Sequence, residues 1–407
     1  MNKETILIEP ADLATTFSHH QKRALMLRLE PIQQRKKLLK KLEGHILANR
    51  DRIGKAVYQD LGKSPMEVDL SEIYPVVGEI RHALEKLDEW TAPQKVDAPI
   101  SYLGTRSKII FEPKGVCLVI APWNYPFSLC FGPLVSCLAA GNTAIIKPSE
   151  MTPHTSSLIG ALVSEFFEAD RVSVVEGGQE VSTQLLRLPF DHIFFTGSPA
   201  VGKIIMKAAA ENLTSVTLEL GGKSPTIIDS TATISDAAKR IAFGKFLNNG
   251  QTCIAPDYIL VHEKVKTEFI NRLKEEVIKL FGENGKIEET SASYARVVNQ
   301  RNFQRLNKLL EDAVSKGAKV ELKGDINEQS NFMHPIILSN VSPMSRMMEE
   351  EIFGPLLPIV SYSLDEEVIH FINNKPKPLA LYIFSHSRSF QKKVLSSTSA
   401  GSVCVNE

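Results

Sequence analysis

Short apolar runs alternate with helical patterns along most of this chain, and that alternation limits its possible folds more than any other feature. Residues 115–120 and 143–146 are apolar runs of strand length, and residues 127–140 between them have a helical pattern. Short apolar strands that are separated by helices are typical of parallel sheets with helices on both faces. The sequence therefore predicts an α/β fold.

The alternation continues on both sides of the glycine pair Gly221-Gly222. Further strands are predicted at 172–175, 193–195, 225–228 and 258–261, and further helices at 153–167, 201–210, 235–247, 265–281 and 302–314. A chain of 407 residues is long enough for two or three domains. The pattern indicates two α/β domains with a boundary near the glycine pair.

The amino-terminal part of the chain has a different character. Residues 32–60 place apolar side chains at helical spacings, which predicts one helix with one apolar face, and Gly62 stands where it can end that helix. Residues 93–111 combine prolines and a glycine with short β-prone runs. This residue pattern indicates a β-hairpin or an arm.

Composition excludes several classes of protein. The chain has 47 basic and 47 acidic residues, so it lacks the excess positive charge of a nucleic-acid binder or a polybasic membrane anchor. No apolar stretch reaches transmembrane length, and residues 1–6 lack a signal-peptide core. The five cysteines are scattered without a CxxC pair, so we expect no metal site, no disulfide framework and a cytoplasmic location.

Two segments come close to a phosphate-binding P-loop without matching it. In residues 197–204, Ile204 stands where the motif needs a hydroxyl for Mg²⁺, and in residues 217–224, Thr217 replaces the first glycine. We therefore exclude a Walker-type NTPase. Residues 197–202 nevertheless follow a strand and open a helix, where free N–H groups favour an anion. An ordinary strand-to-helix turn is the alternative.

Two side chains could carry chemistry near the domain boundary. Cys253 follows polar and glycine residues, which places it in a loop where a thiolate can be accessible, although a buried inert cysteine is the alternative. Glu219 stands between two leucines at a strand end. A carboxylate there has either a pKa tuned for base chemistry or an exposed edge position.

Polar residues also follow two predicted strands of the first domain. Asn124 comes after the first strand and offers an N–H₂ group to an oxyanion, and Lys147 and Glu150 follow the next strand. Ligand sites of open α/β sheets gather at the carboxyl ends of strands. Ordinary strand-to-helix loops are the alternative for each of these segments.

Taken together, these segments match one protein family in their order along the chain and in their residues. The motifs are PWNYPF at 122–127, KPSE at 147–150, FTGSPAVGK at 195–203, LELGGKSP at 218–225, GQTCIAPDY at 250–258 and EEIFGPLLP at 350–358. The sequence resembles the aldehyde dehydrogenase superfamily, and most of all its fatty-aldehyde and dimeric class 3 branch. Family members normally continue for several tens of residues after the point that corresponds to Glu407, so relative to them the sequence lacks a C-terminal tail.

The resemblance implies an aldehyde dehydrogenase-like α/β fold with two doubly wound Rossmann-like domains and a small β arm. Residues 1–92 and 112–221 would form the NAD(P)-binding domain with N-terminal helices, and residues 222–407 the catalytic domain. Residues 93–111 would form a β-hairpin oligomerisation arm, and a homodimer is implied.

The resemblance also implies residue roles. Cys253 matches the nucleophile, Glu219 the base that activates the deacylating water, and Asn124 the oxyanion donor. Cofactor-binding residues are implied at Pro122, Trp123, Lys147, Glu150, Gly197, Ser198, Gly202, Glu351 and Phe353, and Tyr125 is implied to border the substrate.

The implied reaction is oxidation of an aldehyde to a carboxylate by NAD or NADP, through a cysteine thiohemiacetal and a thioester. Two alternatives stand beside it. One is a truncated relative that binds nucleotide without catalysis, and the other is an esterase that uses Cys253 and Glu219 without a cofactor. The expected partner is a small-molecule aldehyde, and no nucleic-acid partner is expected.

Overall fold

The structure, a computed structural model, describes residues 12–407 and divides into two compact units. The first unit comprises the chain up to Asp60 together with Val68–Glu219, and the second comprises Leu61–Glu67 and Leu220–Glu407. Residues 1–11 lie outside the described residues, and they include the start of the predicted first domain and the segment without a signal-peptide core.

Up to residue 220, the helices are α1 (Leu13–Leu27), α2 (Ile32–Ala48), α3 (Arg50–Leu61), α4 (Pro65–Val68), α5 (Tyr74–Thr91), α6 (Ser128–Ala139), α7 (Pro153–Phe166), α8 (Gln179–Leu185) and α9 (Pro199–Glu211). The strands are β1 (Gln94–Val96), β2 (Ser107–Ile109), β3 (Val116–Ile120), β4 (Thr143–Lys147), β5 (Val172–Val174), β6 (His192–Gly197) and β7 (Ser215–Leu220). The predicted alternation begins at β3, and the helices α1, α5 and α8 are additions to the predicted elements.

Strand β3 is the centre of a five-stranded sheet in the first unit, with the order β5-β4-β3-β6-β7. The pairs β5–β4, β4–β3 and β3–β6 are parallel, and β3 is buried along its whole length. The chain runs outward from β3 to β5 and then returns to the other side of β3. The strand order therefore reverses between β3 and β6, and ligands of such sheets bind at the carboxyl ends of strands beside the reversal.

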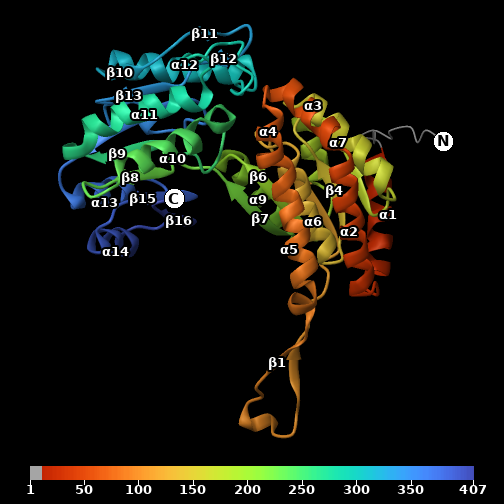
Figure 1. Cartoon of the computed structure of the whole chain (residues 1–407). Helices are drawn as coiled ribbons and strands as arrows, with labels where there is room; N and C mark the ends of the chain where they lie inside the picture. The colour runs from red at the N-terminus through yellow and green to blue at the C-terminus, as the bar shows by residue number, and fades with distance from the viewer. Residues whose placement is uncertain (1–11) are drawn as a thin grey trace. The chain divides into compact units, whose positions relative to one another are not determined.

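An antiparallel hairpin of β1 and β2 extends from the end of α5 (Figure 1). Both strands are exposed along their whole length. In the connection between them, the side chains of Ile100 and Leu103 are 89% and 88% exposed. The hairpin thus presents apolar side chains to solvent.

The second unit has an alternation of its own. Its helices are α10 (Ile234–Phe246), α11 (Lys266–Phe281), α12 (Gln300–Ser315), α13 (Asp365–Asn373) and α14 (Arg388–Ser397). Its strands are β8 (Pro225–Ile228), β9 (Tyr258–His262), β10 (Lys319–Leu322), β11 (Ile326–Asn327), β12 (Phe332–Met333), β13 (Ile336–Ser339), β14 (Leu356–Tyr362), β15 (Ala380–Phe384) and β16 (Ser402–Val405).

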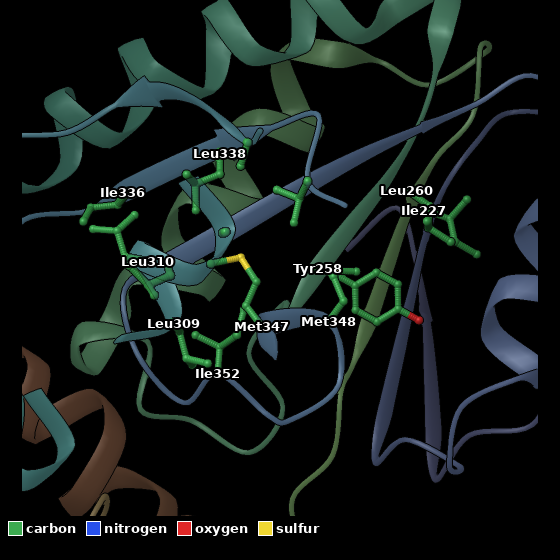
Figure 2. Packing of buried hydrophobic residues seen from close by; sticks show 14 of the residues in the cluster. Ile227, Tyr258, Leu260, Leu309, Leu310, Ile336, Leu338, Met347, Met348 and Ile352 are labelled. Atoms are coloured by element: carbon green, nitrogen blue, oxygen red, sulfur yellow. The ribbon is translucent and has the colours of Figure 1, made fainter. Parts of the chain in front are cut away.

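Seven strands of the second unit form one sheet in the order β10-β13-β14-β9-β8-β15-β16. All neighbouring pairs are parallel except β10 with β13 at one edge. Successive residues of β9 face opposite sides: Tyr258 and Leu260 pack in a cluster with residues of α12, shown in Figure 2, and Ile259 packs with residues of α10 and α11. Both faces of this sheet are therefore buried under helices.

The helix predicted over residues 32–60 is wrong as a single element, because the structure has α2 and α3 with Asn49 between them. The Asn49 backbone leaves helical geometry (φ −103°, ψ 13°), and its side-chain amide donates to His45 O at 2.9 Å. An asparagine side chain that bonds the local backbone competes with the helix in this way. The predicted helix end is confirmed, since Gly62 follows α3 with φ +66°.

The other predicted helices and strands are confirmed, with ends that differ from the prediction by at most two residues. No strand was predicted after residue 314, although the structure places β10 to β16 there. Within residues 12–407, none of the helices combines the length and the apolar character that crossing a bilayer requires.

Candidate active site

The loop between β3 and α6 carries Asn124, whose side chain is buried with only 2% of its surface exposed. The end of this loop is fixed by Glu72, which belongs to a short π-helix at Asp69–Ile73. Its Oε2 accepts hydrogen bonds from the backbone N–H groups of Phe127 (3.1 Å) and Ser128 (2.9 Å). N–H groups at a helix start have no partner within the helix, and the helix dipole favours a carboxylate there. Glu72 therefore fixes how the Asn124 loop enters α6.

Lys147 and Glu150 follow at the end of β4, which is the neighbour of β3. Lys147 is opposite Ile120 in the parallel pairing, so both loops leave the same edge of the sheet. The Lys147 side chain is 4% exposed, and its Nζ donates to Glu150 Oε2 at 2.6 Å. A buried ammonium needs such a partner. The pair offers one donor and one acceptor, which is the chemistry that ribose hydroxyls require.

The glycine turn after β6 leads directly into α9. Ser198 caps the helix, because its Oγ accepts from Val201 N at 3.4 Å. A Cβ on Gly197 would lie 2.5 Å from the Phe195 ring, so a larger residue would not fit without movement. The predicted strand-to-helix turn is present beside the reversal of strand order. The free N–H groups of its first turn fit a phosphate anion.

Glu219 is the last residue but one of β7, an edge strand of the same sheet. Its side chain is exposed. A carboxylate that acts as a base on water must be reachable by water, and this position meets that condition.

In the second unit, Cys253 follows three successive residues with left-handed backbone. The φ angles are +51° at Asn248, +56° at Asn249 and +74° at Gly250. Asparagine and glycine tolerate this geometry better than other residues. A Cβ on Gly250 would lie 2.3 Å from Gly354 O, so glycine is required there. Cys253 is half-buried in a turn before β9, so the residue is partly exposed to solvent.

Buried hydrogen bonds hold residues 248–253, which we call the nucleophile loop because they include the predicted nucleophile Cys253. Gln251 is fully buried, and its Nε2 donates to Arg296 O (2.9 Å) and Asn248 O (3.0 Å), while its Oε1 accepts from Val298 N (3.0 Å). Glu67 accepts from Asn248 N at 2.8 Å. Polar groups buried in this way must be satisfied, and here they join the loop to separate parts of the unit. The Cys253 backbone is therefore preorganised.

Tyr382 on β15 fixes the residue after the nucleophile. Its hydroxyl donates to Ile254 O at 2.6 Å. Burial, together with the nearby thiols of Cys404 and Cys253, raises the pKa of Tyr382 to about 12. The phenol therefore stays protonated at neutral pH and keeps donating to that carbonyl.

Glu351 and Phe353 precede β14, which is the neighbour of β9. Burial, and secondly the charge of Asp257, raises the pKa of Glu351 to about 7, against a hydrogen bond from the Gly222 backbone. A Cβ on Gly221 would lie 2.2 Å from Glu351 Oε2, so the missing side chain leaves room for the carboxylate. The glycine pair Gly221-Gly222 and the EEIFGP motif therefore pack against each other.

Each unit gathers its own share of the predicted residues. In the first unit, the Pro122–Tyr125 loop, Lys147, Glu150 and the Gly197–Gly202 turn lie at the carboxyl ends of β3, β4 and β6. In the second, Cys253, Glu351 and Phe353 precede the neighbouring strands β9 and β14. In the first unit, the donor–acceptor pair and the helix start offer groups that fit the ribose and phosphate of NAD or NADP, and in the second unit Glu351 offers a recessed carboxylate.

The residues that support these loops cannot be identified from the sequence. Glu72 and its helix partner Phe127 are 55 residues apart, and Tyr382 and Ile254 are 128 apart. Local spacing carries no signal for such contacts, because the partners meet only after the sheets form.

Comparison with known proteins agrees with this geometry. A family model, the aldehyde dehydrogenase family, matches residues 8–407. The 4,4'-diaponeurosporen-aldehyde dehydrogenase of Staphylococcus aureus is 46% identical over 92% of this chain and 81% of its own. A dimeric NADP-preferring aldehyde dehydrogenase of Canis lupus familiaris is 39% identical over 100% of this chain and 86% of its own. The substrate-bound structure of Staphylococcus aureus AldH has a TM-score of 0.92 and 43% identity, covering 97% of this chain and 85% of its own.

These matches confirm the predicted aldehyde dehydrogenase-like α/β fold. They also support the oxidation of an aldehyde with NAD or NADP, and they do not favour the non-catalytic or esterase alternatives. The chain therefore belongs to the aldehyde dehydrogenase family.

Proposed function

We propose that this chain oxidises an aldehyde to a carboxylate with Cys253 as the nucleophile, Asn124 as the oxyanion donor and Glu219 as the base. The observation that carries the proposal is the nucleophile loop. It holds a partly exposed cysteine on backbone that buried hydrogen bonds fix. An inert structural cysteine needs no such support.

The chemistry follows from these side chains. The Cys253 thiolate attacks the carbonyl carbon, forming a C–S bond and an oxyanion that the Asn124 side chain and the Cys253 N–H stabilise. A bound nicotinamide supplies the acceptor for the hydride that leaves this carbon. A thioester remains on Cys253. Glu219 then removes a proton from water, and the water oxygen attacks the thioester carbon. The C–S bond breaks, the carboxylic acid leaves, and the proton held by Glu219 returns to the sulfur to give the free thiol.

We further propose how the cofactor is held. Lys147 and Glu150 bind the adenosine ribose, and the start of α9 binds the pyrophosphate. Pro122 and Trp123 line the pocket, and Glu351 and Phe353 position the nicotinamide ribose and ring. Tyr125 borders the substrate. Both NAD and NADP are candidate cofactors.

The first prediction concerns the nucleophile. Cys253→Ala removes the atom that forms the covalent bond, so we expect aldehyde oxidation to fall on the order of 10⁶-fold. The measurement is NAD(P)H formation with a panel of aldehydes, run with NAD and with NADP. The matched control is Cys404→Ala, another half-buried cysteine close to Tyr382, which should keep its activity. Full activity of the Cys253 variant would refute the proposal.

The second prediction separates the base from the nucleophile. Glu219→Gln should leave hydride transfer in place and slow thioester hydrolysis by about 10²–10⁴. Rapid-mixing measurements should then show a burst of NAD(P)H of about one equivalent per active site, followed by a slow phase. Glu211→Gln, an exposed carboxylate at the end of α9, should show wild-type kinetics. An unchanged steady-state rate in the Glu219 variant would rule out its role as the base.

The third prediction uses the raised pKa of Glu351, about 7. The ionised carboxylate is the stronger acceptor for ribose hydroxyls, and it is lost as the pH falls through that pKa. The KM for the cofactor should therefore be constant at higher pH and rise by about tenfold per unit below about pH 7. Glu351→Gln should show a raised KM that does not change with pH. A wild-type KM that is flat from about pH 6 to about pH 8 would contradict this role.

We also propose that the chain is a homodimer in the cytoplasm and that the hairpin of β1 and β2 is its oligomerisation arm. Exposed apolar side chains such as Ile100 and Leu103 support an interaction role. A two-stranded hairpin is only marginally stable on its own, so packing against a second copy would also stabilise it. The five cysteines, none of them in a disulfide, are consistent with a reducing compartment.

The fourth prediction tests this arm. The double substitution Ile100→Ser and Leu103→Ser should convert the dimer into a monomer in light-scattering measurements of molar mass, because it removes the apolar contact area. Leu213→Ser is the control, since Leu213 is 93% exposed outside the hairpin. A dimer that persists in the double variant would show that other surfaces hold it together.

A further inference from the structure

Cationic side chains bind nearly every carbonyl of the segment that leads to Glu351 and Phe353. Lys223 Nζ donates to Met347 O (2.7 Å) and Glu350 O (2.9 Å). Lys375 Nζ donates to Met348 O at 2.6 Å. The Arg305 guanidinium donates to Glu351 O (3.3 Å) and Ile352 O (2.6 Å). We call residues 347–352 the clamped segment, because three cations hold five of its carbonyl groups.

One carboxylate completes this arrangement. Asp257 forms a buried ion pair with Lys223, with side chains that are 4% and 8% exposed, and its other oxygen accepts from Ile352 N at 2.8 Å. Lys223 lies two residues before β8 and Asp257 immediately precedes β9, and Asp257 N donates to Ser224 O at 2.9 Å. The pair therefore joins the starts of two central strands to the segment before a third, β14.

The side chains of the clamped segment are anchored separately from its carbonyls. Met347, Met348 and Ile352 are fully buried in the cluster shown in Figure 2, beside Leu309 and Tyr258. Apolar packing alone tolerates small shifts of backbone, whereas charge-assisted hydrogen bonds to successive carbonyls restrict its orientation. The carbonyl hydrogen bonds and the apolar packing together determine the direction of those side chains of the clamped segment that lie outside the core.

The residue after the clamped segment shows why such restriction matters. Phe353 has φ +48°, a left-handed backbone that is unusual for a bulky side chain. Backbone of this kind persists only when its surroundings over-determine it. The next residue, Gly354, packs against Gly250 of the nucleophile loop. Asp257 itself lies four residues after Cys253 in the chain.

We propose that Lys223 and Asp257 are positioning residues that hold Glu351 and Phe353 in their cofactor-binding orientation and keep them in register with the Cys253 loop. This inference rests on the proposed function for the roles of Glu351 and Cys253. The ion pair acts through the backbone of the clamped segment. Its loss should therefore alter the binding of the cofactor and the mobility of that segment together.

The fifth prediction tests the lysine in the full-length protein. Lys223→Met keeps the length of the side chain and removes its ammonium. The KM for NAD⁺ should rise by about tenfold or more, the effect of losing a charge-assisted hydrogen bond. The backbone amides of residues 347–353 should exchange with deuterium faster, and those of α11 should keep the wild-type rate.

Two further variants sharpen the test. Asp257→Asn keeps an acceptor for Ile352 N and loses the charge opposite Lys223, so it should give a smaller rise in both measurements. Added to Lys223→Met, it should have little further effect, because coupled residues are not additive. The matched control is Lys393→Met, since Lys393 is another lysine of the second unit that pairs with carboxylates, here Asp365 and Glu366. It should keep the wild-type KM and exchange rates.

The outcomes separate this inference from the proposed function. Wild-type KM and exchange in Lys223→Met, or equal changes in Lys393→Met, would overturn the positioning role even if the enzyme oxidises aldehydes. A wild-type chain without dehydrogenase activity would contradict the proposed function, and hydrogen exchange would still decide whether Lys223 holds the segment. If Lys223→Met does not fold, Asp257→Asn decides by the same two measurements.

Discussion

A parallel sheet whose two faces are covered by helices leaves only the ends of its strands for binding and catalysis. The positions of the candidate site residues in this protein follow from that constraint. The connections between parallel strands cross a covered face, so polar side chains reach solvent where strands begin and end. The first unit uses the carboxyl ends of β3, β4 and β6, where Asn124, Lys147 and the Gly197 turn lie. In the second unit the corresponding residues lie at the amino ends of strands, because Lys223, Asp257 and Glu351 precede the neighbouring strands β8, β9 and β14.

Charges inside these units serve orientation more than stability. A buried ion pair loses much of its Coulomb energy to desolvation, so its net contribution to the free energy of unfolding is often small. The Lys147–Glu150 and Lys223–Asp257 pairs nevertheless fix the direction of long side chains at the sheet edges. Lys245 shows the opposite case. Burial lowers its pKa to about 8, so this lysine becomes neutral more easily than an exposed one.

The sequence predicts what is encoded locally. The strand at residues 116–120 and the Cys253 loop could be identified because apolar runs and polar–glycine stretches have short-range signatures. The break at Asn49 was missed, since the apolar spacing continues across it and only a side-chain hydrogen bond to His45 O reveals the interruption. Strands β10 to β16 have no prediction from the sequence, and the preference of a segment for strand depends strongly on its partners elsewhere in the chain. The contacts of Glu72 and Asp257 depend on tertiary structure in the same way.

Backbone strain links two segments of the second unit that carry predicted site residues. A left-handed backbone conformation costs a residue other than glycine about 1–3 kcal/mol of free energy in unfavourable cases. This cost is smallest for asparagine. Asn248 and Asn249 adopt this geometry before Cys253, whereas Phe353 adopts it beside Glu351 with no such intrinsic tolerance. Phe353 therefore depends on neighbours that cannot move independently: the clamped carbonyls before it and the Gly250–Gly354 contact after it. A change that relaxes either neighbour would let Phe353 return to a backbone conformation with negative φ. The nucleophile loop and the clamped segment should then lose their order together.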